Sequence, residues 1–217
     1  MEMCVTAIEP YPKGKGRVAI YLNDKFAFVL YKGELSQYGL EQGVTVDDEL
    51  YRRILDGTLI PRAKKRGMNL LKTMDRTEYD IRHKLSEGGY PEEAVDVTVS
   101  WLKSYHYIDD MRYACEFIRF RSRTDSQRAI ITKLSQKGVA KSVIEEAFRK
   151  HAEEYGEEAE SAETVLLRKL IMKRCPDGAE NLDYAGRQKL YAYLYGKGFS
   201  MTAIEDAVRQ CCRSTNT

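Results

Sequence analysis

One short phrase recurs three times in this chain of 217 residues, at positions 84–90, 133–139 and 193–199. Each copy contains a leucine in second place, a glycine in sixth place and a polar stretch between them. The starting positions give a repeat of about fifty residues, with an insertion before the third copy. Such a repeat predicts one supersecondary unit that is copied and stacked, so that neighbouring copies bury each other's apolar faces.

The repeat extends beyond the phrase itself, because apolar residues align in four columns, of which only the leucine column lies within the phrase. These columns are Ile81, Ile130 and Leu190; Leu85, Leu134 and Leu194; Val95, Ile144 and Ile204; and Val99, Phe148 and Val208. Glycine also recurs in one column, at residues 89, 138 and 198. The alignment indicates that the same helix faces are buried in each copy.

Each copy is typical of a helix, a sharp stop and a second helix. Leu85 follows Ile81 by four residues and so shares its helix face, and Gly89 stands where a left-handed cap would end the helix. Pro91 suits the first turn of the next helix. That helix has an apolar stripe made of Ala94, Val95, Thr98, Val99 and Leu102. A third helix is expected after Asp109 as its N-cap, with Tyr113, Phe117 and Phe120 facing inward.

The first fifty residues have a different character. Residues 4–8, 17–22 and 26–31 are β-branched and aromatic runs, which predict a small three-stranded antiparallel sheet. Three short strands are only half-buried by themselves, so this sheet either leans on the helices or hangs as a mobile arm. Thr45 with Asp48 resembles a capping box that opens a helix ending near Gly57, and a second helix is expected from Thr58 to Met74.

The predicted fold class is mainly α, with tandem three-helix repeats in an elongated curved stack and a small N-terminal antiparallel β region. Six segments are expected along the chain. They are the β region at 1–45, linker helices at 46–75, repeat 1 at 76–124, repeat 2 at 125–176, an incomplete repeat 3 at 177–213 and a disordered tail at 214–217.

Composition and motifs narrow the function. No segment resembles a membrane span or a secretory signal, so we expect a soluble cytoplasmic protein. The five cysteines form no CxxC pair and the three histidines lack a second ligand at zinc-site spacing, which predicts reduced thiols, no metal and no cofactor. Catalytic signatures are absent, and Asp109-Asp110 is better explained by helix capping than by chemistry. We therefore expect no enzymatic activity.

The charge is unevenly distributed. Residues 111–150 contain ten Lys or Arg against four acids, whereas residues 153–163 contain six Glu and no base. Arg112, Arg119 and Arg123 are spaced seven and four apart, which places them along one stripe of the helix after Asp109. A basic surface suits a polyanion or an acidic protein groove, but a solvated helix face paired with the Glu run explains the same pattern.

The helix, glycine turn and helix also suggests a helix-turn-helix reader of DNA. The helices after the turn begin with or contain carboxylates, at Pro91-Glu92-Glu93, Glu145-Glu146 and Glu205-Asp206. Carboxylates repel phosphates and seldom contact base edges other than cytosine, so sequence-specific readout is not expected.

Three segments together resemble the signatures of one protein family. The first is residues 76–85 (Arg-Thr-Glu-Tyr-Asp-Ile-Arg-His-Lys-Leu). The second is Tyr107-Ile108-Asp109-Asp110 with Tyr113-Ala114 and Phe117, and the third is Lys133-Leu134 to Gly138-Val139 with Ile144. In this order they resemble the RecX family, whose members regulate the bacterial recombinase RecA. Ile8-Glu9-Pro10 and residues 17–27 are similar to the strand region of longer members. Where the family often has a glycine that opens the second repeat, this chain has Asp125-Ser126-Gln127, which can serve as a cap.

The resemblance implies a non-enzymatic protein that binds RecA filaments on DNA and modulates, most simply inhibits, strand exchange and ATP hydrolysis in DNA repair and recombination. A monomer is expected, with direct DNA contact as an assisting interaction. The alternatives are a nonspecific nucleic-acid-binding protein and a helical-repeat scaffold for another protein. The contact residues expected by motif position are Lys64, Lys65, Arg66, Arg112, Arg119, Arg121, Arg123, Arg128, Lys133, Lys137 and Lys141.

Overall fold

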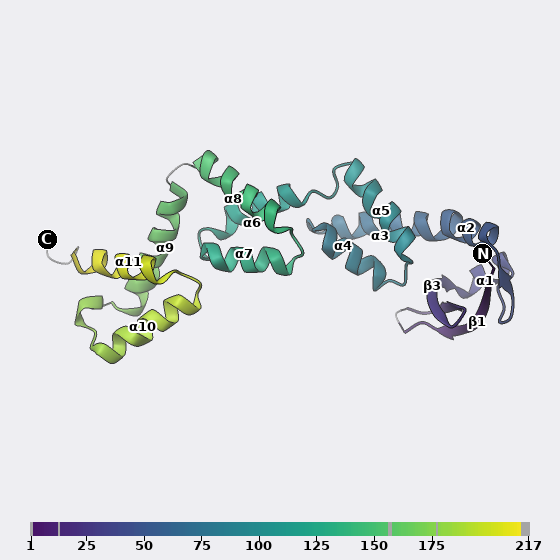
Figure 1. Ribbon diagram of the computed structural model, residues 1–217, viewed down its shortest axis with the longest axis horizontal. Helices are drawn as coiled ribbons and strands as arrows, with labels where there is room; N and C mark the ends of the chain where they lie inside the picture. The colour runs from purple at the N-terminus through teal and green to yellow at the C-terminus, as the bar shows by residue number, and fades with distance from the viewer. Residues whose placement is uncertain (1, 13, 156–157, 177, 214–217) are drawn as a thin grey trace. The chain divides into compact units, whose positions relative to one another are not determined.

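A computed structural model describes residues 2–12, 14–155, 158–176 and 178–213 of the chain (Figure 1). The chain divides into two compact units, Met1–Asp109 and Asp110–Thr217, which we call unit 1 and unit 2. The predicted tail at 214–217 lies outside the described residues. Within the described ranges, none of the helices is both long enough and apolar enough to cross a membrane.

Unit 1 begins with an antiparallel sheet whose strand order is β3-β2-β1-β4. The strands are β1 (Met3–Pro10), β2 (Arg17–Leu22), β3 (Lys25–Tyr31) and β4 (Thr45–Val46). Asn23 and Asp24 both have positive φ, 49° and 62°, which suits the tight turn between β2 and β3. The three predicted strands are present, and the sheet has a fourth strand that was not predicted. The two residues of β4 are too few to show an alternating pattern in the sequence.

The helices that follow the sheet correct two predictions. α1 spans Lys32–Tyr38 and α2 spans Asp48–Ile54. The N-cap of α2 is Asp47, whose side chain accepts a hydrogen bond from the Leu50 amide at 2.7 Å, whereas Thr45 pairs with Cys4 in the sheet. The helical backbone also does not stop at Gly57, since it continues through a π-helical segment, η1 (Leu55–Leu59), into α3 (Ile60–Leu71).

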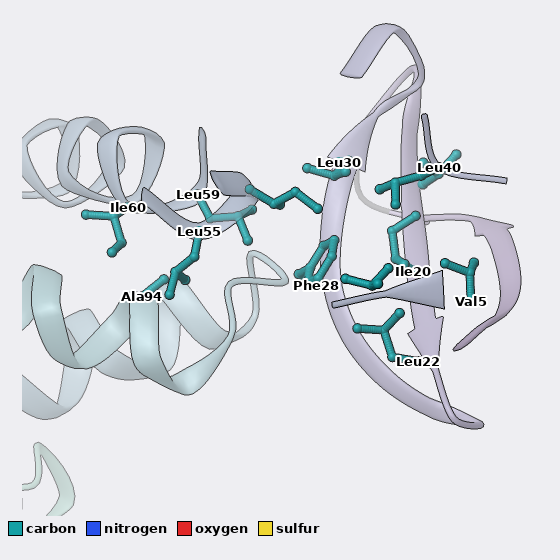
Figure 2. Packing of buried hydrophobic residues seen from close by; sticks show 13 residues of the cluster. Val5, Ile20, Leu22, Phe28, Leu30, Leu40, Leu55, Leu59, Ile60 and Ala94 are labelled. Atoms are coloured by element: carbon teal, nitrogen blue, oxygen red, sulfur yellow. The ribbon is translucent and has the colours of Figure 1, made fainter. Parts of the chain in front are cut away.

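Burial explains why the glycine does not end this helix. Leu55 and Leu59 are fully buried and pack with Phe28 of the sheet in one hydrophobic cluster. Figure 2 shows these side chains between the sheet and the helices, with Ala94 from a later helix beside them. The apolar burial on both sides of Gly57 outweighs the roughly 1 kcal/mol by which glycine disfavours a helix interior. The sheet therefore packs against the helices, which is the first of the two arrangements predicted from the sequence.

The first three-helix module consists of α3, α4 (Glu78–Ser86) and α5 (Glu92–Ser104) (Figure 1). Thr77 caps α4 by accepting a hydrogen bond from the Asp80 amide at 3.1 Å. All five residues of the predicted α5 stripe are buried. Gly67 of α3 allows close packing on α5, because a Cβ there would lie 2.9 Å from Leu102 Cδ1.

Unit 2 contains two further modules. The first consists of α6 (Asp110–Arg121), α7 (Gln127–Gln136) and α8 (Lys141–Tyr155) around Ile118, Leu134 and Ile144. The second consists of α9 (Glu158–Arg174), α10 (Tyr184–Gly196) and α11 (Met201–Arg213), with a 3-10 turn, η2 (Ala179–Asn181), and a core around Leu194 and Phe199. Tandem three-helix modules after a small antiparallel sheet confirm the predicted fold class.

The repeat columns are confirmed residue by residue. Of the twelve aligned apolar residues, Phe148 is partly buried and the others are at most 8% exposed. The three aligned glycines have φ values of 81°, 74° and 96°, so each turn uses the left-handed conformation that glycine adopts without steric cost.

The helices are grouped one step earlier than the predicted repeat boundaries. We expected the helix after Asp109 to close repeat 1 and residues up to 176 to belong to repeat 2, whereas α6 packs with α7 and α8, and α9 packs with α10 and α11. The sequence repeat marks the glycine turn between two helices. It does not indicate which flanking helix completes the module.

Candidate partner-binding surface

Most of the basic residues expected to contact a partner lie on or next to α6 and α7. α6 buries Ala114 and Ile118, and Tyr113 and Phe117 of the predicted aromatic stripe pack against the same core. Tyr113 and Phe117 are half-buried with ring centroids 6.1 Å apart, but Phe120 is 68% exposed. The inward placement of Phe120 was therefore wrong, because aromatic spacing alone does not distinguish a core stripe from an adjacent exposed one.

The α6 cations point to solvent. Arg112, Arg119 and Arg121 are exposed residues of the helix, and Arg123 is exposed in the turn after it, so the predicted stripe continues past the helix end. Arg119 donates to Glu116 at 2.6 Å and its guanidinium lies 5.1 Å from the Phe120 ring centroid. The exposed Phe120 ring thus lies in a cation–π contact with Arg119. An exposed arginine beside an aromatic ring is suited to binding either a protein or a nucleic acid.

Two of the predicted contacts converge on one carboxylate. Lys133 of α7 donates to Asp125 Oδ2 at 2.7 Å, and Arg121 Nε of α6 lies 3.8 Å from the same oxygen. The Asp125 side chain is only 18% exposed, whereas the two basic side chains are about half exposed. Asp125 therefore holds the ends of α6 and α7 together and leaves excess positive charge facing outward.

The remaining unit 2 cations are more dispersed. Arg128 lies over the Tyr195 ring at 5.8 Å, and Lys141 is 3.6 Å from Glu145. Lys137 follows α7 as its C-cap and is partly buried. Arg149 donates to Glu146, and this hydrogen bond lowers the pKa of that carboxyl. Lys141 and Arg149 thus pair with nearby acids, and the side chains of 155–162 in the expected acidic strip lie outside the described part of the chain.

In unit 1 the expected group at 64–66 is divided between two places. Lys64 Nζ lies 5.1 Å from the Trp101 ring centroid, and Trp101 belongs to an aromatic cluster with Tyr105 and Tyr107. Lys65 and Arg66 instead line a cavity whose lining does not include Lys64. Neither the aromatic cluster nor that cavity was predicted from the sequence, although the close spacing of Trp101, Tyr105 and Tyr107 is a visible signal for the cluster.

A network of ion pairs joins α4 to α5 in the first module. Glu78 accepts hydrogen bonds from Arg82 at 2.8 Å and from Lys103 at 2.7 Å, and Arg82 also donates to Asp96. Burial acts to raise the pKa of Glu78, but the hydrogen bonds and charges of Lys103 and Arg82 prevail and lower it. The network joins two helices of one module, so we assign it a structural role. None of its residues was among the predicted partner contacts.

The fold and surface define a class of protein, namely a helical-repeat protein that presents exposed cations from successive three-helix modules. Sequence models of the three RecX domains match this chain in order: the first three-helix domain at residues 63–102, the second at 109–147 and the third at 162–208. These ranges coincide with α3–α5, α6–α8 and α9–α11. The chain belongs to the RecX family.

Relatives and solved structures agree with this assignment. The chain is 28% identical to "Regulatory protein RecX" of Clostridium acetobutylicum over 99% of both chains. It is 31% identical to the protein of the same name from Limosilactobacillus reuteri, over 89% of this chain and 71% of that one. A crystal structure of regulatory protein RecX has a TM-score of 0.60 and 30% identity, covering 94% of this chain and 99% of that chain. The predicted family resemblance is confirmed, and the protein is a member of a family of regulators.

Proposed function

We propose that this protein regulates the RecA recombinase by binding RecA filaments assembled on DNA, without catalysing a reaction itself. The action that the sequence resemblance favours is inhibition of ATP hydrolysis and strand exchange in DNA repair and recombination. Membership of a family named for regulation supports the regulatory role. We further propose that the protein acts as a monomer in the cytoplasm.

One observation carries the choice of surface. The cations on α6 and α7 remain exposed although Arg119, Arg121 and Lys133 each contact a neighbouring acid. The Arg119–Glu116 pair is exposed on both sides and contributes about 0–1 kcal/mol to stability, so a partner can replace Glu116 at small cost. Complementary charge on a filament would speed association and set the register of binding.

ATP hydrolysis tests the proposal most simply. RecA is assembled on single-stranded DNA, and the hydrolysis rate is followed as this protein is added up to stoichiometric excess. We expect the rate to fall with increasing protein. An unchanged rate of ATP hydrolysis at a stoichiometric excess of this protein would refute the proposal.

The exposed cations also support a second candidate, a nonspecific nucleic-acid-binding protein that acts through DNA alone. Neutralising several phosphates releases counterions, so such a protein would bind bare DNA with a steep dependence on salt concentration. Strong binding to DNA without RecA, combined with that salt dependence, would favour this candidate. A scaffold for some other protein would show neither effect.

A further inference from the structure

A basic pocket lies in unit 1 between the N-terminal sheet and the first module. The cavity has a volume of about 480 Å³. Its lining includes five cations and one carboxylate: Arg17, Arg62, Lys65, Arg66, Lys84 and Glu87. The cations come from β2, α3 and α4, so the pocket exists only because the sheet docks against the helices.

The docking contact fixes the walls of the basic pocket. Gly89 O accepts a hydrogen bond from the Val29 amide of β3 at 3.0 Å, and Arg17 donates to Gly88 O. Tyr11 Oη donates to Glu87 O at 2.8 Å. A Cβ at Gly89 would lie 2.2 Å from Val29 Cγ2, so only glycine allows the edge of the sheet to approach the turn this closely.

The charge of the pocket is only partly compensated from within. Glu87 accepts from Lys84 at 2.9 Å, and Glu34 accepts from Arg62 at 3.0 Å. Lys65 and Arg66 are exposed and form no ion pair with any other residue that the structure describes. An excess of positive charge therefore remains around one small cavity, which is a state that an anion would relieve.

The shape favours a compact anion with several charges. Proteins that bind a single strand of nucleic acid use a groove that spreads cations along the backbone, which carries one charge per nucleotide. Here the cations surround a single cavity whose volume lies in the range of small-molecule sites, about 300–1,000 Å³. Arginine and lysine are the side chains that bind phosphate oxygens best, and Tyr31, 45% exposed, adds an aromatic ring to the lining.

We propose that the basic pocket binds a ligand with two or more linked phosphate groups, such as a nucleoside triphosphate or a free oligophosphate. Arg17, Arg62 and Lys84 form the fixed walls, and Lys65 and Arg66 close over the phosphates from α3. The proposal goes beyond the regulatory function above and is tested without RecA, so either can fail alone.

The test is calorimetric titration of the full chain at physiological salt without magnesium, using tripolyphosphate, ATP, orthophosphate and a short oligo-dT strand in separate arms. We expect tripolyphosphate or ATP to bind more tightly than orthophosphate; a stronger signal for ATP would assign the nucleoside form. Lys65→Glu with Arg66→Glu should weaken that binding about tenfold or more, because two attractive charges become repulsive. The matched control, Lys25→Glu with Arg53→Glu, reverses two exposed cations of unit 1 outside the pocket lining and should retain it.

Three results would overturn the proposal. One is the absence of binding by both tripolyphosphate and ATP. Another is an equal loss of affinity in the pocket variant and the control, which would indicate a general charge effect. The third is binding of oligo-dT that depends on Lys65 and Arg66 while tripolyphosphate does not bind, which would assign the pocket to a nucleic-acid strand.

Discussion

Ser126 and Gly198 join the two modules of unit 2 and give the sharpest test of how the repeats pack. Ser126 is 1% exposed and is the N-cap of α7, where its Oγ accepts from the Ala129 amide at 3.3 Å. The same hydroxyl donates to the carbonyl of Lys197 at 2.8 Å, in the glycine turn between α10 and α11. A Cβ at Gly198 would lie 2.6 Å from Ser126 Oγ. One hydroxyl thus caps its own module and binds the next.

The magnitudes follow from these contacts. Ser126→Ala removes an N-cap, worth about 1 kcal/mol, and a hydrogen bond between modules, worth about 1 kcal/mol more. Gly198→Ala places a Cβ at a φ of 96° and against the hydroxyl, with an expected cost of about 2–4 kcal/mol. In the double variant the overlap disappears with the hydroxyl. Its cost should therefore fall short of the sum by about 1 kcal/mol or more.

Urea unfolding followed by far-UV circular dichroism measures the free energy of unfolding of the wild type, the two single variants and the double variant. Ser135→Ala serves as the control, because Ser135 is an exposed hydroxyl on the same helix, and its effect should stay within about 0.5 kcal/mol. Fluorescence of Trp101, the single tryptophan, gives a separate readout of unit 1. If Ser126→Ala costs no more than the control, or if the double variant is strictly additive, the packing of the turn on the α7 cap is refuted.

Two further predictions concern the charged surface. Arg119→Glu with Arg123→Glu should leave the helix content by circular dichroism unchanged and lower filament binding about tenfold. The control, Lys169→Glu with Lys173→Glu on α9, should retain filament binding. Unfolding of the first variant would contradict the exposed placement of Arg119 and Arg123. Glu78→Gln should lower the free energy of unfolding by about 1 kcal/mol at neutral pH. Because the folded pKa of Glu78 is lowered, its contribution is complete above the ordinary value of 4.5 and is lost as pH falls through the folded pKa, so urea titrations of wild type and variant should converge in acid. A difference that persists at low pH would contradict this origin.

The sequence was sufficient to predict the repeats, since they depend on apolar spacing and on glycine. Leu85, Leu134 and Leu194 are fully buried because a four-residue spacing on a helix determines which residues share a face. Left-handed turns at the three glycines were predictable for the same local reason. Features that depend on tertiary contacts could not be predicted in this way. β4 has only two residues, too few for a pattern, and the π-helical segment at Gly57 is held by burial against the sheet.

The candidate sites show the same division. The exposure of Arg119 and Arg123 could be predicted, because their spacing separates them from the buried Ala114 and Ile118. The basic pocket could not be predicted from the sequence. Hydrogen bonds between the sheet and a turn some seventy residues later in the chain bring Arg17 to α3. A local pattern contains no information about such a distant contact.

Direct binding to filaments tests whether this RecX family member acts on RecA assembled on DNA. Biotinylated single-stranded DNA is immobilised, either bare or coated with RecA and a non-hydrolysable nucleotide, and the bound fraction of this protein is measured at physiological salt. We expect tighter binding to the coated strand than to the bare one. Equal binding to both, or binding to bare DNA alone, would contradict it.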